Sequence, residues 1–201
     1  MNDVGPVVEE NMRIGLFGGS FNPAHSGHLH ISKIALECLK LDRVWWLLSP
    51  QNPLKEAKDY ASYVDRAQSA RAVIDIPEIE LSFFEQQQKI TYSVDTIRQL
   101  LELHGDVDFV WLMGADAFAG LECWKDWRTI FETIPIAVFN RPEFTKTALE
   151  SKAARLYAEF RLDERDAALL PGKKAPAWCF ISQPLDYTSS TDIRAQRKSG
   201  R

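Results

Sequence analysis

The chain has 201 residues, which is enough for one domain with a sizeable core and few for two. Hydrophobic residues make up 45% of the chain and charged residues 26%, the composition of an ordinary globular protein. Asp and Glu outnumber Lys and Arg by 28 to 24, and the resulting net charge of −4 argues against a nucleic-acid-binding protein, whose binding face is usually basic.

Strand-like and helix-like segments alternate along the chain. A short apolar strand at 13–17 runs into Gly18 and Gly19, and a helix at 27–40 follows, with apolar residues at i, i+3 and i+4 spacing. We expect the remaining strands at 43–48, 78–83, 108–113, 134–139 and 178–182. We expect the remaining helices at 60–75, 92–104, 145–162 and 190–197.

Continuous apolar strands that alternate with helices predict an α/β fold, in which a Rossmann-like, doubly wound parallel sheet carries helices on both faces in a single domain. We expect residues 12–201 to form this domain and residues 1–11 to be a disordered N-terminal extension. In such a sheet, ligands bind beyond the carboxyl ends of the strands, near the point where the strand order reverses. Site residues should therefore follow strands in the sequence.

The stretch GGSFNPAHSGH at 18–28 joins the first strand to the first helix. Glycines there let the backbone approach a ligand, and the N–H groups of a helix start favour an anion. His25 and His28 are three residues apart, so both imidazoles can lie on one side of the helix start and donate to phosphate oxygens. Together with His30 they form an alternative metal-binding set, but no Cys or carboxylate lies nearby to complete it. We therefore expect a phosphate site, with His30 as a surface or packing residue.

Further polar segments follow the other expected strands or begin the later helices. Together with the first stretch they are GGSFNPAHSGH at 18–28, SPQNPLK at 49–55, TYSVDT at 91–96, MGAD at 113–116 with Trp124 and Lys125, Arg141 with Pro142, and SSTDIR at 189–194. In this order they resemble the motifs of the nicotinate- and nicotinamide-nucleotide adenylyltransferases, members of the HxGH nucleotidyltransferase superfamily. One short segment could match by chance, whereas six in the same order indicate membership of the family.

The resemblance implies an activity. A member of this family transfers the adenylyl group of ATP to nicotinate mononucleotide, giving nicotinate adenine dinucleotide and pyrophosphate in NAD biosynthesis. Three alternatives stay open: nicotinamide mononucleotide as acceptor, another acceptor of the superfamily such as phosphopantetheine, and a nucleotide-binding module without turnover. The pair Thr91 and Tyr92 and the aromatic Trp124 favour a pyridine nucleotide, and an intact set of cationic residues argues against the module.

The chemistry explains which residue types are needed. The attacking phosphate is already an anion, so the reaction requires no protein nucleophile or general base. The protein must align two anions and stabilise charge on the transferring and leaving phosphates, a task for cationic side chains and backbone N–H groups. The expected catalytic residues are His25, His28, Lys55 and Arg194. The expected ATP-binding residues are Gly18, Gly19, Ser20, Phe21, His25, His28, Gly114, Asp116, Ser189, Ser190, Thr191 and Arg194. The expected acceptor-binding residues are Asn22, Lys55, Thr91, Tyr92, Trp124, Lys125 and Arg141.

Several of these roles have alternatives. Asp116, at a strand end, can accept from ribose hydroxyls or cap a helix. Trp124 and Trp127 are three residues apart on an expected helix, where core packing is the default. The resemblance makes Trp124 the residue that stacks on the pyridine ring and Trp127 a core residue. Thr91 and Tyr92 begin a helix whose N–H groups can receive the pyridine carboxylate. Mg²⁺ is expected to bridge the phosphates, held by them and by water and not by a dedicated protein site.

The three cysteines, Cys38, Cys123 and Cys179, lie far apart and show no CxxC spacing. This spacing argues against a disulfide framework or a Cys-rich zinc site and favours a reducing compartment. The N-terminus lacks the pattern of a signal peptide, and no stretch approaches the ~18–20 apolar residues that span a bilayer. We expect a cytoplasmic enzyme that binds ATP and nicotinate mononucleotide, with no nucleic acid or membrane as partner, and we leave open a homo-oligomer.

Overall fold

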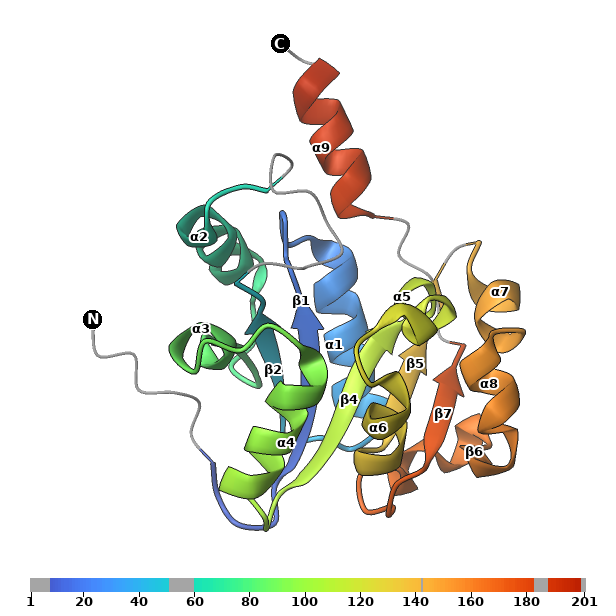
Figure 1. The fold of residues 1–201 in the computed structure, drawn as a ribbon. Helices are drawn as coiled ribbons and strands as arrows, with labels where there is room; N and C mark the ends of the chain where they lie inside the picture. The colour runs from blue at the N-terminus through green and yellow to red at the C-terminus, as the bar shows by residue number, and fades with distance from the viewer. Residues whose placement is uncertain (1–7, 51–59, 142, 183–187, 200–201) are drawn as a thin grey trace.

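The structure is a computed structural model that describes residues 8–50, 60–141, 143–182 and 188–199. It contains one sheet flanked by helices (Figure 1). The strands are β1 (Arg13–Gly19), β2 (Arg43–Leu48), β3 (Ile79–Ser82), β4 (Asp108–Gly114), β5 (Ile136–Phe139), β6 (Arg161–Leu162) and β7 (Trp178–Ile181). The helices are α1 (Ser26–Cys38), α2 (Tyr63–Val73), α3 (Phe84–Gln87), α4 (Ser93–Leu103), α5 (Ala115–Ala119), α6 (Trp127–Thr133), α7 (Thr145–Leu149), α8 (Lys152–Leu156) and α9 (Ser190–Ser199). Short 3-10 helices lie at η2 (Leu121–Cys123), η3 (Ala158–Phe160) and η4 (Glu164–Leu169).

The sheet has the order β3-β2-β1-β4-β5-β7-β6, and each of its neighbouring pairs is parallel. From β1 the chain winds outward through β2 and β3, and then crosses to the other side of β1 and continues through β4 and β5. The strand order therefore reverses between β1 and β4. This topology confirms the expected doubly wound parallel sheet, and a ligand crevice is expected beyond the carboxyl ends of these two strands.

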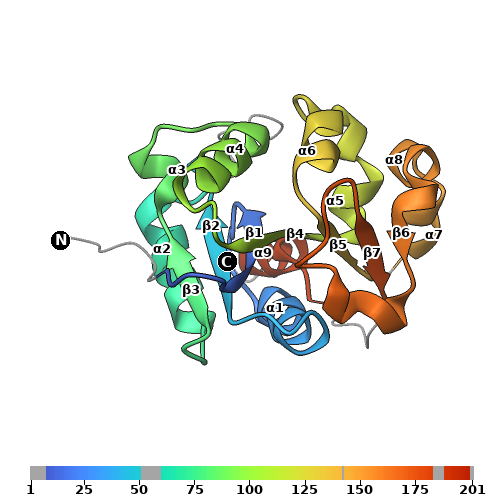
Figure 2. The ribbon, with the colours of Figure 1, turned by 90° about the horizontal axis from the view of Figure 1, so that it is seen from below.

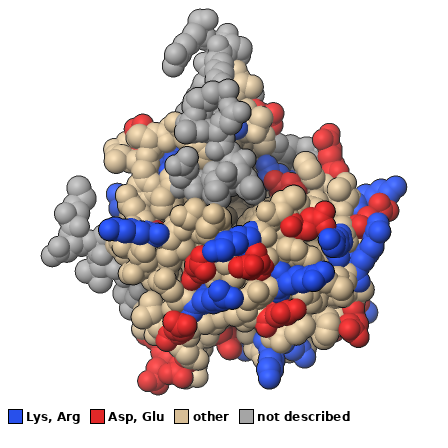
Figure 3. Space-filling view, in the orientation of Figure 1, with Lys and Arg blue, Asp and Glu red and all other residues tan. Residues whose placement is uncertain are grey.

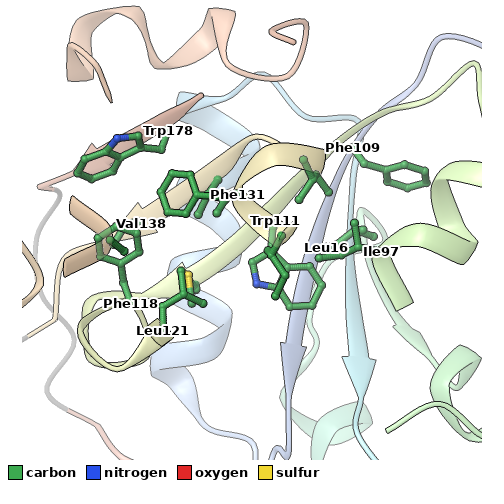
Figure 4. Packing of buried hydrophobic residues seen from close by; sticks show 14 of the residues in the cluster. Leu16, Ile97, Phe109, Trp111, Phe118, Leu121, Phe131, Val138 and Trp178 are labelled. Atoms are coloured by element: carbon green, nitrogen blue, oxygen red, sulfur yellow. The ribbon is translucent and has the colours of Figure 1, made fainter. Parts of the chain in front are cut away.

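Both faces of the sheet are buried. On one face Leu16, Trp111 and Val138 pack against side chains of α4, α5 and α6 (Figure 4). On the other face Trp46 and Leu112 pack against α1 and α2. Seen from below, α1 lies on one side of the sheet and α4 and α6 lie on the other (Figure 2). Because successive strand residues point to opposite buried faces, each strand is a continuous apolar run in the sequence, and this made the strands predictable.

The prediction of one charged helix at 145–162 is wrong. The chain instead forms α7, α8, the 3-10 helix η3 and the two-residue strand β6. The Ser151 side chain accepts a hydrogen bond from the N–H of Ala154, so it caps a new helix where the predicted one should have continued. Strand β6 then pairs with β7 and extends the sheet. A local cap and a tertiary strand partner thus outweigh the helical composition of this segment.

The remaining predicted strands and helices are found within a few residues of their expected ends. No residue range was predicted for α3, α5 and α6, which have 4, 5 and 7 residues and are too short for a helical period to be recognised. Within the expected N-terminal extension, Val8 packs partly against the core, and the N–H of Asn11 donates to the backbone carbonyl oxygen of Asp106 at 2.9 Å. None of the described helices is long and apolar enough to cross a membrane.

Acidic and basic side chains intermingle over the face shown in Figure 3. Most of the described ion pairs are substantially exposed, as in Lys33 with Asp75 and Lys152 with Glu122. Exposed pairs of this kind contribute at most about 1 kcal/mol each. The stability of the fold therefore depends chiefly on the two apolar cores.

Candidate active site

A cavity of about 610 Å³ opens beyond the carboxyl ends of β1 and β4, and this volume is typical of a small-molecule site. Its wall includes the turn at 18–28, hereafter the signature turn, together with the starts of α4, α5 and α9. The predicted site residues that line it are Gly18, Gly19, Ser20, Phe21, His25, His28, Thr91, Tyr92, Gly114, Asp116, Trp124, Lys125, Arg141, Ser190, Thr191 and Arg194. The fold thus gathers most of the predicted residues into one place.

His25 and His28 lie side by side at the start of α1, with ring centroids 3.8 Å apart. His25 is the N-cap residue, and its Nδ1 accepts from the N–H of Gly27 at 3.1 Å. Nδ1 of His28 in turn accepts from the N–H of His25 at 3.2 Å. A neutral imidazole whose Nδ1 accepts a hydrogen bond carries its proton on Nε2. Both rings are therefore held with Nε2 as the donor, at a helix start that favours an anion.

Two glycines of the signature turn are required by close packing, in addition to letting the backbone approach a ligand. A Cβ added to Gly18 would lie 2.8 Å from the ring of Trp111. A Cβ added to Gly27 would lie 3.0 Å from the ring of His25 and 3.1 Å from the carbonyl oxygen of Thr188. Any larger residue at position 27 would therefore displace the imidazole pair or the segment that leads into α9.

Helix α9 is attached to the signature turn by two side chains. Arg194 Nη1 donates to the carbonyl oxygen of Asn22 at 2.6 Å, and Ser190 Oγ donates to that of Pro23 at 2.9 Å. Arg194 Nη2 also donates to Thr191 Oγ1 at 3.3 Å. Figure 1 shows α9 rising from the carboxyl edge of the sheet. A guanidinium with several N–H donors thus lies between the turn and the helix, where it lines the cavity.

Asp116 and Arg141 form an ion pair in the cavity wall. Arg141 Nη1 lies 3.0 Å from Asp116 Oδ2, and their side chains are 28% and 33% exposed. Asp116 is the second residue of α5, whose N-cap is Gly114, so the alternative reading of Asp116 as the N-cap is wrong. A sugar bound here would meet a carboxylate acceptor and a guanidinium donor next to each other.

Another part of the wall is aromatic. Trp124 packs edge-on against Trp111, with centroids 6.5 Å apart, and Lys125 Nζ lies 4.4 Å from the centroid of the Tyr92 ring. Tyr92 is the N-cap residue of α4, and no side chain caps this helix start. The first N–H groups of α4 and an indole ring therefore belong to the same wall.

The expectation that Trp124 and Trp127 share one helix is wrong. Trp124 follows η2, Asp126 has a left-handed backbone with φ of 49°, and Trp127 begins α6. Both indoles pack partly against the core, but Trp124 lines the cavity and Trp127 is absent from its lining. The left-handed residue between them turns the two side chains toward different surroundings.

Two predicted site residues, Asn22 and Ser189, have other positions. Asn22 is buried, and its Oδ1 accepts from the N–H of Ala61 at 3.1 Å, so its side chain supports the turn from behind. Ser189 Oγ accepts from the N–H of Asp192 at 3.2 Å at the start of α9. Neither residue is part of the cavity lining. Lys55 lies outside the described residues.

The cavity also includes residues that the sequence did not predict as site residues, among them His30 and Glu85. Glu85 is 6% exposed, and its Oε1 accepts from the hydroxyl of Thr96 at 2.9 Å. Burial raises the pKa of the Glu85 carboxyl to about 7, although the Thr96 hydrogen bond opposes this. The only sequence signal for Glu85 is its place just before TYSVDT, and His30 is two residues from His28 on α1. Among the described residues, no three His, Cys, Asp or Glu side chains form a metal-binding group.

Known proteins resemble the chain over most of its length. The chain matches the family described as cytidylyltransferase-like over residues 16–196. A relative from Parvibaculum lavamentivorans is 48% identical over 188 residues, which cover 94% of each chain. A relative from Ruegeria pomeroyi is 46% identical over 190 residues, which cover 94% of this chain and 89% of the relative. Both are named probable nicotinate-nucleotide adenylyltransferase.

A solved structure shares the fold. The Plasmodium falciparum nicotinic acid mononucleotide adenylyltransferase complexed with NaAD superposes with a TM-score of 0.69, over 92% of this chain and 83% of that chain. Its sequence is 18% identical, so this likeness concerns the fold alone. The family match and the identity to the curated relatives, by contrast, extend over almost the whole chain. The chain therefore belongs to the nicotinate-nucleotide adenylyltransferases, a group of nucleotidyltransferases of the cytidylyltransferase-like family.

Proposed function

We propose that this cavity joins ATP to nicotinate mononucleotide, with His25 and His28 at the reacting phosphates. The observation that carries the proposal is the imidazole pair, because both Nε2 atoms are held as donors at a helix start. A phosphate oxygen of the mononucleotide forms a bond to the α-phosphorus of ATP. The bond from that phosphorus to the oxygen bridging to the β-phosphate breaks, and pyrophosphate leaves with the electron pair. Fixed donors beside the α-phosphate would stabilise the negative charge that develops there.

In this proposal the signature turn and α9 hold ATP. Backbone groups of 18–21 approach the nucleotide, and Asp116 accepts from its ribose. Ser190, Thr191 and Arg194 bind the β- and γ-phosphates, and Lys55 is assigned to the phosphates through the family motif. Arg194 supports this assignment because its guanidinium already spans two acceptors, the Asn22 carbonyl and the Thr191 hydroxyl, which phosphate oxygens could replace.

The acceptor would bind along the aromatic wall. A pyridinium ring is a flat cation, and an indole face is its best aromatic partner, so Trp124 is the stacking residue. The N–H groups at Thr91 and Tyr92 would face the pyridine carboxylate, while Lys125 and Arg141 complete the acceptor-binding set. The raised pKa of Glu85, about 7, leaves this buried carboxyl partly protonated near neutral pH, which limits its repulsion of a substrate carboxylate.

Mg²⁺ belongs to the proposal as a companion of the phosphates. The described residues contain no group of three carboxylate, imidazole or thiol ligands that would hold it. Phosphate oxygens and water suit this hard cation, which dehydrates reluctantly. When bound there, it would neutralise part of the triphosphate charge.

Several wider expectations rest on the same proposal. They are the cytoplasmic location, the single nucleotidyltransferase domain at 12–201 and the absence of nucleic-acid and membrane partners. Size-exclusion chromatography with light scattering of the full chain measures the oligomeric state directly.

The test is a pyrophosphate-release assay with ATP, Mg²⁺ and a panel of acceptors. The panel contains nicotinate mononucleotide, nicotinamide mononucleotide, phosphopantetheine and no acceptor. We expect the highest kcat/KM with nicotinate mononucleotide and the dinucleotide as the product by mass. Tight ATP binding without turnover on any acceptor would favour the nucleotide-binding module, and turnover only with phosphopantetheine would reassign the acceptor.

A further inference from the structure

Arg66 is a buried arginine on α2 that lies behind the cavity wall. It is 2% exposed and is not part of the cavity lining. Its Nη1 donates to the carbonyl oxygens of Ser20 at 2.7 Å and Ser49 at 2.8 Å, and its Nη2 donates to that of Pro50 at 2.8 Å. One planar guanidinium thus holds three backbone carbonyls that belong to two separate loops.

The charge of Arg66 is costly where it lies. None of the ion pairs found among the described residues involves it, and desolvation lowers the pKa of its guanidinium. The rings of Tyr60 and Tyr63 lie 5.3 and 5.2 Å from its Cζ and offset part of that cost. An apolar side chain could fill this space without desolvating a charge, but it could not donate to three carbonyls. The arginine is therefore better explained by the loops that it fixes than by stability alone.

The two loops continue directly into the cavity. Ser20 follows β1 and Ser49 follows β2, and both line the cavity. The N–H of Ser49 donates to the carbonyl oxygen of Gly19 at 2.9 Å, so the two loops are joined to each other as well as to Arg66. In a planar trans peptide, the carbonyl and the following N–H point in opposite directions. Because the Ser20 carbonyl points to Arg66, which is not part of the cavity lining, the N–H of Phe21 points away from Arg66, and Phe21 itself lines the cavity.

Phe21 itself needs such support. Its backbone is left-handed, with φ of 44°, a conformation that costs a non-glycine residue of the order of 1 kcal/mol or more. Its ring is held by stacking on Trp46, with centroids 4.8 Å apart. Helix α2 adds a second attachment, since the Ser69 hydroxyl oxygen accepts from the N–H of Ala24 at 3.2 Å. The peptide between residues 20 and 21 is thus fixed on both sides.

We propose that Arg66 is a positioning residue, which orients the Ser20–Phe21 peptide so that its N–H donates to a substrate phosphate. The inference rests on the proposed function, because it needs a phosphate-bearing ligand in this cavity. That phosphate can come from ATP or from the mononucleotide, and the two sources share the same recognition chemistry. Arg66 acts through the backbone and does not touch either substrate.

Substitutions of Arg66 test the positioning role. Arg66→Lys keeps the charge but cannot span three carbonyls, and Arg66→Met keeps much of the volume without a donor. Calorimetry should compare ATP with adenosine, and nicotinate mononucleotide with nicotinate riboside, on each folded variant. For the ligand whose phosphate meets Phe21, we expect Kd to weaken about 10- to 100-fold, with less than about 3-fold change for the matching nucleoside. The matched control is Arg71→Met, which replaces an exposed arginine on the same helix. It should change neither the Kd of the phosphorylated ligand nor that of its nucleoside.

Two results would overturn the role. Parallel weakening of the phosphorylated ligand and its nucleoside would show that Arg66 merely keeps the cavity in shape. Unchanged binding of both would show that the guanidinium positions nothing. The comparison within each pair removes the effect of any general loss of stability.

A measurement on the unaltered chain covers the case in which neither variant folds. Serine labelled at the carbonyl carbon and phenylalanine labelled at nitrogen select the Ser20–Phe21 and Ser82–Phe83 peptides, the two Ser-Phe pairs of the sequence. ATP or nicotinate mononucleotide should shift the Phe21 amide resonance, whereas the nucleosides should leave it nearly in place. The Phe83 amide, outside the cavity lining, is the internal control. Substrate binding with no shift at Phe21 contradicts this inference alone, whereas absence of substrate binding contradicts the proposed function.

Discussion

The cavity has two parts that the chain builds in different ways. The phosphate wall consists of residues 18–21, His25, His28 and Arg194, and all but Arg194 come from one strand end, turn and helix start. The ring wall consists of Glu85, Thr91, Tyr92, Trp124 and Lys125, contributed by α3, by the start of α4 and by the segment around η2. One wall is local in sequence and the other is assembled by the fold.

The chemistry of the two walls differs as well. The phosphate wall offers imidazole, guanidinium and backbone donors to anions. The ring wall offers an indole face, a helix start and a buried carboxyl of raised pKa. Loss of a donor from the first wall should therefore affect the chemical step, whereas changes in the second should affect which acceptor is bound and how stability depends on pH.

The largest effect is expected from the imidazole pair. His25→Ala or His28→Ala should lower kcat about 10²- to 10³-fold, because in the proposed function each removes a fixed donor from the place where charge develops. ATP binding should weaken much less, which steady-state kinetics and calorimetry can separate. His104→Ala, outside the cavity lining, is the control and should stay within about threefold of the unaltered enzyme. A double variant with near-normal turnover would mean that the two histidines are structural.

The second effect concerns stability, and it comes from Glu85 in the ring wall. Its pKa rises from 4.5 to about 7 on folding. Below pH 4.5 both states are protonated. As pH rises toward 7, the unfolded chain loses this proton first, so the free energy of unfolding falls by about 3 kcal/mol. Glu85→Gln should abolish this decrease, as measured by urea unfolding between pH 4.5 and 8.

The control for that measurement is Glu102→Gln, at an exposed position of α4. It should leave the pH dependence of the unfolding free energy unchanged. If Glu85→Gln also leaves it unchanged, the Glu85 carboxyl is ionised in the folded protein at neutral pH and hydrated through the cavity.

A smaller effect is expected when Arg194 is changed in the phosphate wall. Arg194→Ala should raise the KM for ATP by about 10- to 50-fold, since a two-point, charge-assisted contact is lost. Arg194→Lys should recover little, because an ammonium cannot donate to two acceptors in one plane. Arg165→Ala, at an exposed position of η4, is the control. If the kinetics of Arg194→Lys were unchanged, Arg194 would not be part of the ATP-binding site.

The difference between the phosphate wall and the ring wall also shows what the sequence could predict. The sheet was predictable because both its faces are buried, and the phosphate wall was predictable because a strand end, a turn and a helix start are adjacent in the chain. The sequence did not show that Asn22 turns away to accept from Ala61, because that depends on where α2 packs. It also missed the break at Asp126, a left-handed residue that is not a glycine.

The missed elements have a common physical cause. Helix α3 has four residues, so no apolar period marked Glu85 as buried, and its contact with Thr96 forms only when α4 packs beside it. Segment 145–162 has helical composition, but Ser151 caps a new helix, and Arg161 and Leu162 form a strand that pairs with β7. Short elements and edge strands are decided by tertiary partners, which periodicity within a segment does not reveal.

The smallest predicted effect concerns the choice between nicotinate and nicotinamide mononucleotide at the ring wall. The start of α4 offers N–H groups with no side-chain cap, and Thr91, which lines the cavity, immediately precedes the N-cap residue Tyr92. A carboxylate can accept from every donor, whereas a carboxamide must turn its NH₂ toward some of them, and an unpaired buried donor costs about 1–3 kcal/mol. The acid should therefore be preferred by about 10-fold or more in kcat/KM.

Two variants sharpen this prediction. Trp124→Ala should weaken the binding of both acceptors about equally, because in the proposed function the indole stacks on the ring that they share, and the preference should remain. Thr91→Ala should instead narrow the preference by removing one donor near the carboxylate. The measurement is kcat/KM for both mononucleotides on the unaltered enzyme and the two variants, with Trp127→Phe as a control for an indole outside the cavity lining. Equal or reversed preference in the unaltered enzyme would contradict the nicotinate assignment and leave the adenylyl transfer reaction standing, because that reaction depends on the phosphate wall.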